Sequence, residues 1–390
     1  MLLRTHHQKS IGVLLSENMM LCILILLGMG LFMVMDATAP KNVNQGTISL
    51  QVIKQLSWDV LGLVCFGGII MLIPVKLIKS SSFWIGLLSI ALLAAVLVVG
   101  VEIKGARRWF RIGSLGFQPS ELAKVGGILF FGWYLDKYKD AVSSWFGMFR
   151  CMMLILLMIG LIAIEPDLGN AALLFAVLVG MLFIAGAKLS HLISLLMITL
   201  PLFIYGMYTK FDHVKKRIMV YLNPEDHIND GFYQGNQALI ALGSGGWNGK
   251  GIGMGLQKLY YLPEAHNDFI FAIIGEDLGF IGCAAVVSVY GLLVWYAIQV
   301  CFRCADLFSL LVSFGITCLF AGQALFNISV VTALVPNKGI SLPLISYGGS
   351  NALFTLIGLG ILVKLTRGLP PDCPRGLGAI RNSPKKVPLF

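Results

Sequence analysis

The side chains that could carry chemistry gather in four polar segments, each bordering a long apolar run. The first segment runs from Gly105 to Lys124. Within it, Pro119 suits the first position of a helix. Glu121 then takes the third position, where a carboxylate complements the helix dipole. Lys124 follows three residues later on the same helical face, so it can form an ion pair with Glu121. Ionisable groups beside an apolar helix are costly without a purpose, so this pair is a candidate functional site.

The second polar segment, Glu165-Pro166-Asp167-Leu168-Gly169-Asn170, forms a turn between two apolar runs. Asp167 or Asn170 can act as the N-cap of the following helix, which needs no role beyond structure. The Asp167 carboxylate can equally face a substrate. The sequence leaves both interpretations open.

The third polar segment is the longest loop, from about residue 209 to residue 267, and it contains a glycine-rich stretch from Gly243 to Gly255. This stretch does not match a nucleotide-binding loop, because Ser244 stands where that motif needs its first glycine and Gly251 where it needs Ser or Thr. Glycine avoids collisions where the backbone passes close to a neighbour. We therefore expect this backbone to lie close to the membrane surface or to a ligand.

The end of this loop carries acidic and basic groups directly before an apolar run. Asp268 can be a helix N-cap or a general base, since Glu264, His266 and Asp268 together supply the groups that proton transfer needs. The helix dipole should lower the pKa of Asp268 whereas burial should raise it, and the sequence does not decide between them. Two turns deeper in the apolar run, Glu276 and Asp277 predict an internal polar cavity.

The fourth polar segment, residues 335–351, breaks an apolar run with Pro336, Pro343 and a pair of glycines. Broken helices at membrane depth are tolerated where they face protein or a cavity. Ser346 and Tyr347 add hydroxyl groups to this segment. We therefore expect all four segments to line one outward-facing cleft.

The elements that position these segments must be membrane-spanning helices. The chain is 57% hydrophobic and only 12% charged, against about 25% charged in soluble domains. Its apolar runs are continuous and long enough to cross a hydrocarbon core of about 30 Å, which favours helices over a barrel. We expect an all-α, polytopic integral membrane protein with about ten transmembrane helices, and a long extracytoplasmic loop between helices 7 and 8. The expected spans are residues 19–35, 58–77, 83–101, 122–135, 149–164, 170–185, 189–208, 268–300, 307–335 and 340–363.

These spans form a single domain, residues 19–366, between an N-terminal tail of residues 1–18 and a basic C-terminal tail of residues 367–390. An even number of spans puts both tails on one side, and their positive charge makes that side cytoplasmic. The eighth span exceeds what a bilayer needs, so it should project from the membrane or kink. Residues 19–35 are too long for an ordinary signal peptide and continue into Asp36, so they are interpreted as the first span.

The net charge of +10 comes from Lys and Arg residues in short loops and at the two ends, which favours anionic lipid over nucleic acid as a partner. Several cations, including Arg108 and Lys258, fall in loops expected outside. They either reach up to phospholipid headgroups or face a negatively charged, lipid-borne substrate. Most of the eight cysteines border apolar runs, so the close pair Cys301 and Cys304 is not expected to be a metal or redox site.

At its polar segments the chain resembles the shape, elongation, division and sporulation family of cell-wall polymerases. The division members match better than the elongation members. The resemblance covers nearly the whole chain, together with a weaker match at IKQLSWDVLG. It rests on four stretches in the family's order: GARRWFRIGSLGFQPSELAK, EPDLGNAALLFAVLVGMLFIAGA, YQGNQALIALGSGGWNGKGIGMGLQKLYYLPEAHNDFIFAIIGEDLGFIG and LVPNKGISLPLISYGGSN.

The resemblance implies a ten-span glycosyltransferase that polymerises lipid II, the disaccharide-pentapeptide carried on undecaprenyl pyrophosphate. Such a protein works at the outer face of the bacterial cytoplasmic (inner) membrane, here at the division septum. The implied partners are lipid II, a class B penicillin-binding transpeptidase, other division proteins and membrane lipids. A divalent cation, Mg²⁺ or Mn²⁺, is also implied, with no ligands assigned.

The family's essential aspartate falls on Asp268, which we expect to be the catalytic base for the acceptor hydroxyl. Its conserved Glu and Lys fall on Glu121 and Lys124. Cations should stabilise the leaving diphosphate, with Arg108, Lys124 and either Lys258 or Lys338 as candidates. The full set of expected substrate-binding residues is Arg108, Trp109, Gln118, Ser120, Glu121, Lys124, Asp167, Gln234, Gln237, Lys258, Glu264, His266, Glu276, Lys338, Ser346 and Tyr347.

The sequence departs from the family pattern at a few positions near these residues. Asp36, Asn170, Asn267, Asp277 and Asn351 replace the usual Ser, Thr, Thr, Glu and Ser. Two other functions remain open. A lipid II flippase would also use broken helices and buried carboxylates, and a non-catalytic scaffold would only recruit the transpeptidase.

Overall fold

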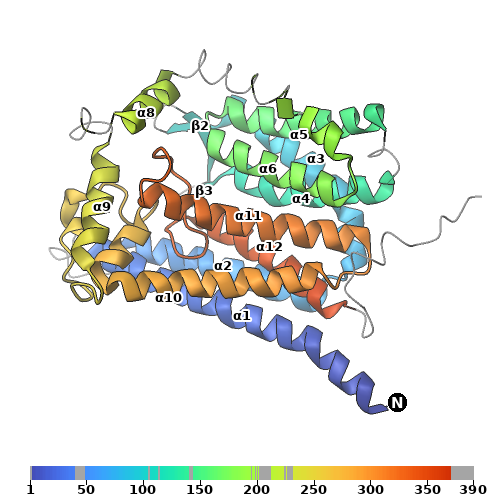
Figure 1. Cartoon of the computed structure of the whole chain (residues 1–390), viewed down its shortest axis with the longest axis horizontal. Coiled ribbons are helices and arrows are strands. Elements are labelled where there is room, and N and C mark those ends of the chain that lie inside the picture. Colours follow the sequence, from blue (N-terminus) through green and yellow to red (C-terminus); the bar gives the residue numbers. More distant parts are fainter. Residues whose placement is uncertain are drawn as a thin grey trace, which may run out of the picture.

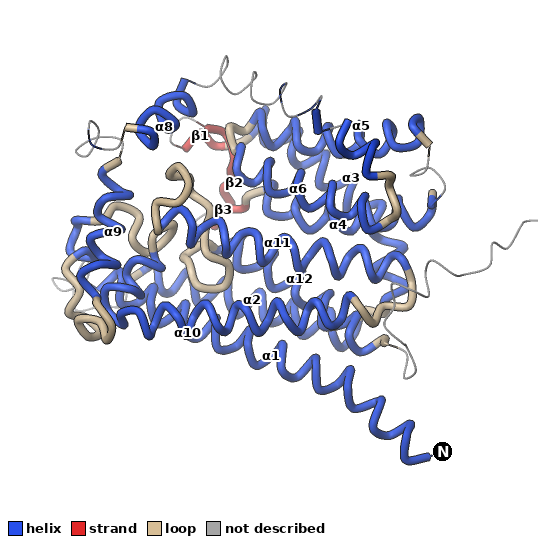
Figure 2. The backbone as a smooth tube through the Cα atoms, viewed as in Figure 1, coloured by secondary structure: helices blue, strands red, loops and turns tan. Residues whose placement is uncertain are grey.

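The computed structural model describes residues 2–39, 49–103, 106–112, 115–139, 144–194, 196–197, 199, 201, 212–223, 225 and 232–369. Within these residues the chain is mostly helical, and its long helices lie side by side along one axis of the molecule (Figure 1). Figure 2 shows the strands and the longest loops on the side of the bundle that also holds α8 and α9.

Seven helices of the described part are long and apolar enough to cross a membrane. The apolar α6 (Leu168–Ile184) is shorter, and α4 (Pro119–Lys137) carries charged residues in its first turns. Together they correspond to nine of the ten expected spans and confirm a multi-pass helical membrane protein; half of the expected span 189–208 falls outside the described residues. The seven are α1 (Leu2–Thr38), α2 (Leu50–Leu72), α3 (Val75–Val99), α5 (Trp145–Ile164), α10 (Ile270–Cys301), α11 (Leu307–Val331) and α12 (Gly349–Arg367).

Local sequence sets where the functional segments enter their helices. α4 begins at Pro119 and carries Glu121 in its first turn, as the sequence predicts. α10 begins at Ile270, and its N-cap position is Phe269, so Asp268 lies just outside the helix and is not its N-cap.

The broken segment before α12 is longer than predicted. α11 ends at Val331 and α12 starts only at Gly349, so residues 332–348 form an irregular loop rather than the start of a span at residue 340. Proline lacks the backbone N–H that a helix needs, and this loop contains Pro336 and Pro343. Leu344 adopts a left-handed φ of 69° in the same loop, which a helix cannot include.

α10 runs for 32 residues but is broken by Gly279, whose φ of 66° and ψ of −164° lie outside the helical region. The kink expected in this span is therefore present. A Cβ at Gly279 would lie 2.3 Å from the backbone nitrogen of Gly249, so only glycine fits where the loop backbone crosses the helix.

A small antiparallel sheet, which the sequence did not predict, joins α3 to α4. It contains β1 (Val101–Ile103), β2 (Ala106–Ile112) and β3 (Leu115–Phe117), in the order β1-β2-β3. The sheet places Arg108 and Trp109 on its central strand, and β3 leads from there into the helix that carries Glu121.

The expected long loop between the seventh and eighth spans holds helices in its described part. These are α8 (Asp212–Leu222), α9 (Tyr233–Gly245) and a single π-helical turn, η4 (Gln257–Tyr261). Figure 1 shows α8 and α9 at one end of the bundle, with α9 beside the start of α10. The loop thus covers one end of the spanning helices.

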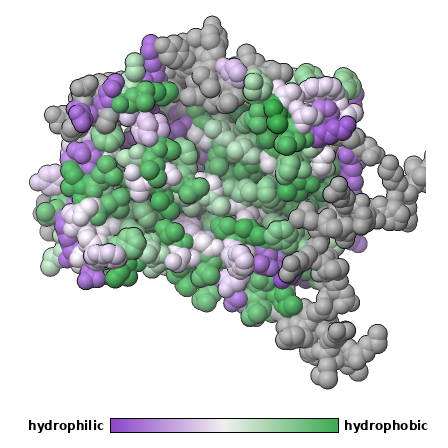
Figure 3. All heavy atoms as spheres, in the orientation of Figure 1, coloured by the Kyte–Doolittle hydropathy of each residue, from purple (hydrophilic) through white to green (hydrophobic). Residues whose placement is uncertain are grey.

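Burial separates central from peripheral helices. In α11 and α12, 78% of the most apolar window is buried inside the protein, against 22% in α10 and 28% in α3. The exposed apolar side chains of the peripheral helices give the molecule a hydrophobic surface, seen as green in Figure 3. α11 and α12 therefore form the protein-enclosed centre, and they border the loop of residues 332–348.

Candidate functional site

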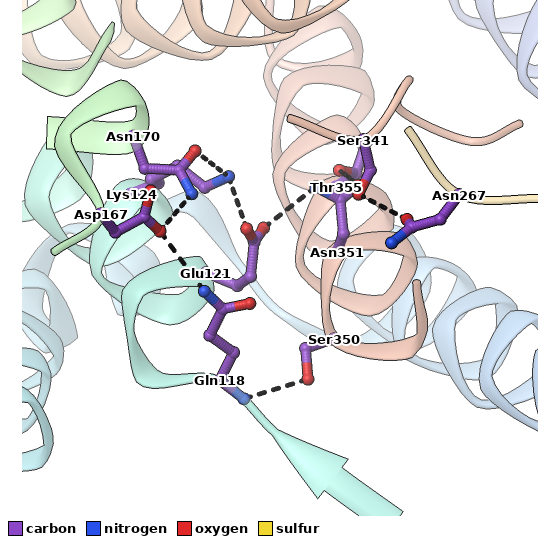
Figure 4. Close-up of polar contacts among 10 residues, drawn as sticks. All are labelled: Gln118, Glu121, Lys124, Asp167, Asn170, Asn267, Ser341, Ser350, Asn351 and Thr355. Atoms are coloured by element: carbon purple, nitrogen blue, oxygen red, sulfur yellow. Dashed lines mark hydrogen bonds and ion pairs between the residues drawn. The ribbon is translucent and has the colours of Figure 1, made fainter. Parts of the chain in front are cut away.

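A buried ion pair lies at the start of α4. Lys124 Nζ is 2.8 Å from Glu121 Oε1, and the two residues are only 2% and 5% exposed. Lys124 also donates to Asn170 Oδ1 at 3.3 Å, and Asn351 Nδ2 donates to the second oxygen of Glu121 at 3.2 Å. Figure 4 shows this pair between α6 and α12. The predicted ion pair is confirmed, and both of its charges have additional polar partners.

Asp167 extends this network toward the turn after α5. Its Oδ2 accepts hydrogen bonds from Asn170 Nδ2 at 2.8 Å and from Gln118 Nε2 at 3.4 Å. Asp167 occupies the N-cap position of α6, but its side chain makes no capping bond there. The carboxylate therefore serves the side-chain network rather than the helix end.

Gln118 and Ser350 connect the sheet to α12. The Gln118 backbone N–H donates to Ser350 Oγ at 3.1 Å (Figure 4). Ser350 donates in turn to Gly116 O at 3.1 Å. Ser120 is completely buried, and within the described residues its hydroxyl has no hydrogen-bond partner. Gln118 thus belongs to the network, whereas Ser120 lies beside it.

Arg108 binds the turn between α5 and α6 through backbone atoms. Its Nε donates to Glu165 O at 2.5 Å and its Nη2 to Pro166 O at 2.9 Å. A guanidinium has five N–H donors, so these bonds leave donors for a further acceptor. The neighbouring Trp109 is half-buried, and its ring packs on Gly116.

Lys338, in the loop before α12, reaches toward the same turn. A Cβ at Gly169 would lie 2.8 Å from Lys338 Cε, so the lysine side chain crosses directly over this glycine. Burial lowers the pKa of Lys338 to about 8; the charge of Asp167 raises it, and the charges of Arg217 and Arg108 lower it further. Three cations and one carboxylate therefore share this region.

Arg217 is the member of this group that sequence reasoning missed. It lies on α8 and is exposed at the surface. Neighbouring protein atoms nevertheless desolvate its guanidinium group and lower its pKa. The charge of Arg108 lowers this pKa further, and the charge of Asp268 raises it. Arg217 thus links the arginine of the sheet with the aspartate before α10.

Asp268 lies against the loop before α12. A Cβ at Gly339 would be 2.5 Å from Asp268 Oδ2, so the carboxylate rests directly on this glycine. Asn327 on α11 fixes the position: its Nδ2 donates to Asp268 O and to Ile340 O, both at 2.8 Å. Because Gly339 follows Lys338 in the chain, Asp268 and the lysine are positioned by one short segment.

The residues before Asp268 are also fastened to this loop. Tyr347 N–H donates to His266 O at 3.0 Å, with the two rings 5.6 Å apart, and Ser341 Oγ bonds to Asn267 Oδ1 at 3.2 Å (Figure 4). Ser346 accepts the Leu342 N–H at 2.8 Å and so closes a turn of the loop. Glu264, three residues after η4, has a left-handed φ of 56°.

These contacts connect the residues of the candidate site into a closed ring. Glu121, Lys124, Asn170 and Asp167 make one side, and the contact between Gly169 and Lys338 continues it to Asp268. The other side returns through Asn267, Ser341 and Asn351, since a Cβ at Gly348 would lie within 3.7 Å of both Ser341 and Asn351. Parts of the four polar segments, at residues 118–124, 165–170, 266–268 and 337–351, therefore meet as predicted, whereas Gly249 and Gly255 of the third segment lie against α10 instead.

Gln234 and Gln237 lie on α9. Gln234 Oε1 accepts a hydrogen bond from Asn337 Nδ2 at 2.9 Å, which places it beside Lys338. Gln237 is half-buried on the same helix. Gln234 therefore contacts the loop before α12.

Lys258 and Glu276 belong to a separate buried cluster. Lys258 Nζ lies 2.5 Å from Asp36 Oδ2 and 2.7 Å from Asp277 Oδ2. Glu276 accepts bonds from Lys250 Nζ and from the backbone N–H groups of Leu256 and Gln257, at 2.8 to 3.0 Å. Each charge is paired within the protein, so these residues hold η4 against α1 and α10.

Two glycines of the glycine-rich stretch, Gly249 and Gly255, lie against this second cluster. A Cβ at Gly249 would lie 2.1 Å from Asp277 O, and one at Gly255 would lie 2.5 Å from Asp277 Oδ1. At these two positions the close neighbour that excludes side chains is the backbone and carboxylate of α10, rather than the membrane surface or ligand that the sequence suggested. Glu276 and Asp277 likewise meet protein donors, and not the predicted polar cavity.

The comparison with known proteins decides the family. A model of the FtsW, RodA and SpoVE family, described as cell cycle proteins, matches residues 17–369. The chain belongs to this family. It is 36% identical over 358 residues to "Probable peptidoglycan glycosyltransferase FtsW" of Trichlorobacter lovleyi, covering 90% of this chain and 93% of the relative. A protein of the same description from Hahella chejuensis is 35% identical over 349 residues, covering 88% and 87%.

Solved structures of similar proteins agree with the fold. RodA of Thermus thermophilus, a rod shape determining protein, has a TM-score of 0.64 at 26% identity, covering 91% of this chain and 97% of that one. A chain from a structure described as "Structural coordination of polymerization and crosslinking by a peptidoglycan synthase complex" has a TM-score of 0.73 at 26% identity, covering 90% and 97%. This chain therefore shares the fold of the FtsW, RodA and SpoVE family over most of its length.

The departures from the family pattern fall at the contacts just described. Asn170 and Asn351 bond to Lys124 and Glu121 respectively. Asp36 and Asp277 both pair with Lys258. Each departure retains a polar contact, and Asp36 could not have been assigned from sequence because 222 positions separate it from Lys258.

A divalent cation has no ready-made site among the described residues, which contain no group of three His, Cys, Asp or Glu side chains arranged to hold one. Mg²⁺ is often bound by one or two carboxylates together with substrate phosphates. The described residues alone therefore do not form a preformed metal centre.

Proposed function

We propose that this chain is a peptidoglycan glycosyltransferase that polymerises lipid II at the outer face of the cytoplasmic membrane. The observation that carries the proposal is the placement of Asp268 beside Arg217, Lys338 and Arg108, in a chain whose relatives are named as such enzymes. Lipid-borne sugar diphosphates are both apolar and anionic, so a cationic site in a membrane protein suits them.

Asp268 acts as the general base in this proposal. It accepts the proton of the 4-hydroxyl of the acceptor GlcNAc as that oxygen attacks the anomeric carbon of the MurNAc donor. The bond from this carbon to the diphosphate breaks in the same displacement, which inverts the anomeric centre. Asn327 supports this role because it holds the Asp268 backbone without using the carboxylate.

Arg108, Arg217 and Lys338 bind the departing diphosphate and stabilise its charge. Lys124 and Lys258 were also candidates for this task. Both are 7% exposed or less and are paired with carboxylates, so we assign Lys124 to positioning α4 and Lys258 to holding η4. A Mg²⁺ or Mn²⁺ ion would arrive with the diphosphate, and its ligands from the protein stay unassigned.

The cellular setting follows from the same proposal. Both termini lie in the cytoplasm, and the loops that carry Asp268 and Lys338 lie outside, where lipid II is consumed. A class B penicillin-binding transpeptidase is the expected partner, and the resemblance to division proteins places the complex at the septum. The relatives described as FtsW support this assignment.

The proposal is tested with purified protein and its transpeptidase partner in vesicles that contain labelled lipid II. Wild type should yield glycan polymer, and Asp268→Ala should yield none. Asp306→Asn is a matched control, because Asp306 caps the start of α11, at the far end of that helix from the site. Translocation of lipid II without polymer would instead identify a flippase. Absence of both polymerisation and translocation would identify a non-catalytic scaffold.

A further inference from the structure

Glu165 is a buried carboxylic acid that the proposed mechanism does not use. It is 1% exposed, at the end of α5, in the turn that leads to Asp167. Among the residues that the structure describes, neither of its carboxylate oxygens has a hydrogen-bond partner. A buried ionised carboxylate without partners is very costly, whereas a protonated one is much less so.

The bonds of Arg108 point to the same state. Its Nε and Nη2 donate to the carbonyl oxygens of Glu165 and Pro166, and not to the Glu165 carboxylate. Charge-assisted bonds to a carboxylate are about twice as strong as bonds to neutral acceptors. An ionised Glu165 should therefore capture the arginine, but the structure directs the arginine to the backbone.

We propose that Glu165 is kept protonated and acts as a positioning residue, shaping the turn that Arg108 binds while leaving the arginine charge for an anionic donor. This inference rests on the proposed function for the identity of that donor. Pro166 lies in the same turn: its φ of 32° is far from the usual proline value, and its carbonyl accepts one of the Arg108 bonds.

The charges around Glu165 are consistent with a retained proton. Burial raises the pKa of Glu165 to about 8, the neighbouring Asp167 carboxylate raises it, and Arg108 on β2 lowers it. Lys338 and Arg217 lie one step further, beside Arg108 and Asp167. Below this pKa Glu165 is neutral, and above it a carboxylate forms that competes with the donor for Arg108.

The protonation state is tested first, without any need for enzyme activity. The infrared difference spectrum of wild type minus Glu165→Gln at pH 7 should contain the carbonyl stretch of a protonated carboxylic acid. This band should vanish as the pH passes 8. Its absence at pH 7 would overturn the inference, whatever the outcome for the proposed function.

The positioning role is tested by polymerisation kinetics in vesicles. Glu165→Ala should raise the KM for lipid II by about tenfold because Arg108 loses its exact position. Glu165→Gln, a neutral isostere, should restore KM to near the wild-type value at pH 7. If Glu165→Gln is as defective as Glu165→Ala at pH 7, a negative charge is required and the inference is wrong.

The pH profile separates Glu165 from Lys338, whose own charge is lost in the same range. In a Lys338→Arg background the cation at position 338 stays charged, so the remaining rise of KM above pH 8 belongs to Glu165. Adding Glu165→Gln should abolish that rise. An unchanged rise in the double variant would contradict the inference.

A third experiment measures Mn²⁺ binding by wild type and by Glu165→Gln. Loss of binding in Glu165→Gln would show that Glu165 is a metal ligand instead of a protonated acid.

Discussion

Lys124 Nζ lies 2.8 Å from Glu121 Oε1 inside the protein, three residues away on the same helix. Each partner also bonds to an asparagine, from α6 on one side and from α12 on the other. The pair therefore joins three helices at the level of the proposed site. Breaking it should affect both stability and the positions of the residues around it.

Removing one charge of this pair should be strongly destabilising. Lys124→Met leaves Glu121 buried without its cation, and such changes cost about 3–5 kcal/mol. Thermal unfolding in detergent should show a large drop in Tm. The matched control is Lys79→Met, which removes a cation from a more exposed pair with Asp136 and should cost at most about 1 kcal/mol. Equal losses in the two variants would contradict this account of Lys124.

Gly339 should be needed for activity rather than for folding. Gly339→Ala puts a methyl group 2.5 Å from Asp268 Oδ2, so the carboxylate must move. Misplacement of a catalytic group by about 1 Å can lower the rate about 100-fold. Gly348→Ala is the control in the same loop, because its new Cβ would meet nothing closer than 3.5 Å. Polymerisation by both variants checks the prediction, and normal activity of Gly339→Ala would argue against Asp268 as the base.

Arg217 should contribute to binding the donor. Arg217→Gln removes a cation beside Arg108 and Asp268, so the KM for lipid II should rise about tenfold, or about 1.4 kcal/mol, with a smaller change in kcat. Lys188→Gln, an exposed cation in the turn after α6, is the matched control and should leave KM unchanged. A fall in kcat at constant KM would assign Arg217 to catalysis instead.

Activity should depend on the charge of Lys338. Because burial lowers its pKa to about 8, Lys338 is charged below this pH and loses its charge as the pH rises through it. The affinity for an anionic donor should therefore fall between about pH 7 and pH 9. Lys338→Arg keeps its charge throughout, so its alkaline decline should be smaller and owed to Glu165. A profile in Lys338→Arg identical to that of wild type would exclude this role.

Much of the fold was predictable because local signals determine it. Long apolar runs predicted the spanning helices, and Pro119 followed by Glu121 and Lys124 predicted both the start of α4 and its ion pair. These features depend on neighbours within one or two helical turns. The meeting of the four polar segments was also predictable, since each of them borders a span.

What the sequence could not provide were partners far apart in the chain. Arg217 lies on a polar helix within a long loop, with no motif that sets it apart from nearby cations. Lys258 appeared equivalent to Lys338, yet it is paired with Asp36 from α1 while Lys338 lies over Gly169. Only the folded arrangement separates a cation that is neutralised by the protein from one that faces the site.

The most direct test of the central claim is single-turnover transfer by Asp268→Asn, compared with wild type and Asp306→Asn. The asparagine keeps the shape of the side chain but cannot accept the proton. We predict that Asp268→Asn binds lipid II as tightly as wild type and forms no glycan bond, while Asp306→Asn does both. Glycan formation by Asp268→Asn at the wild-type rate would contradict the account.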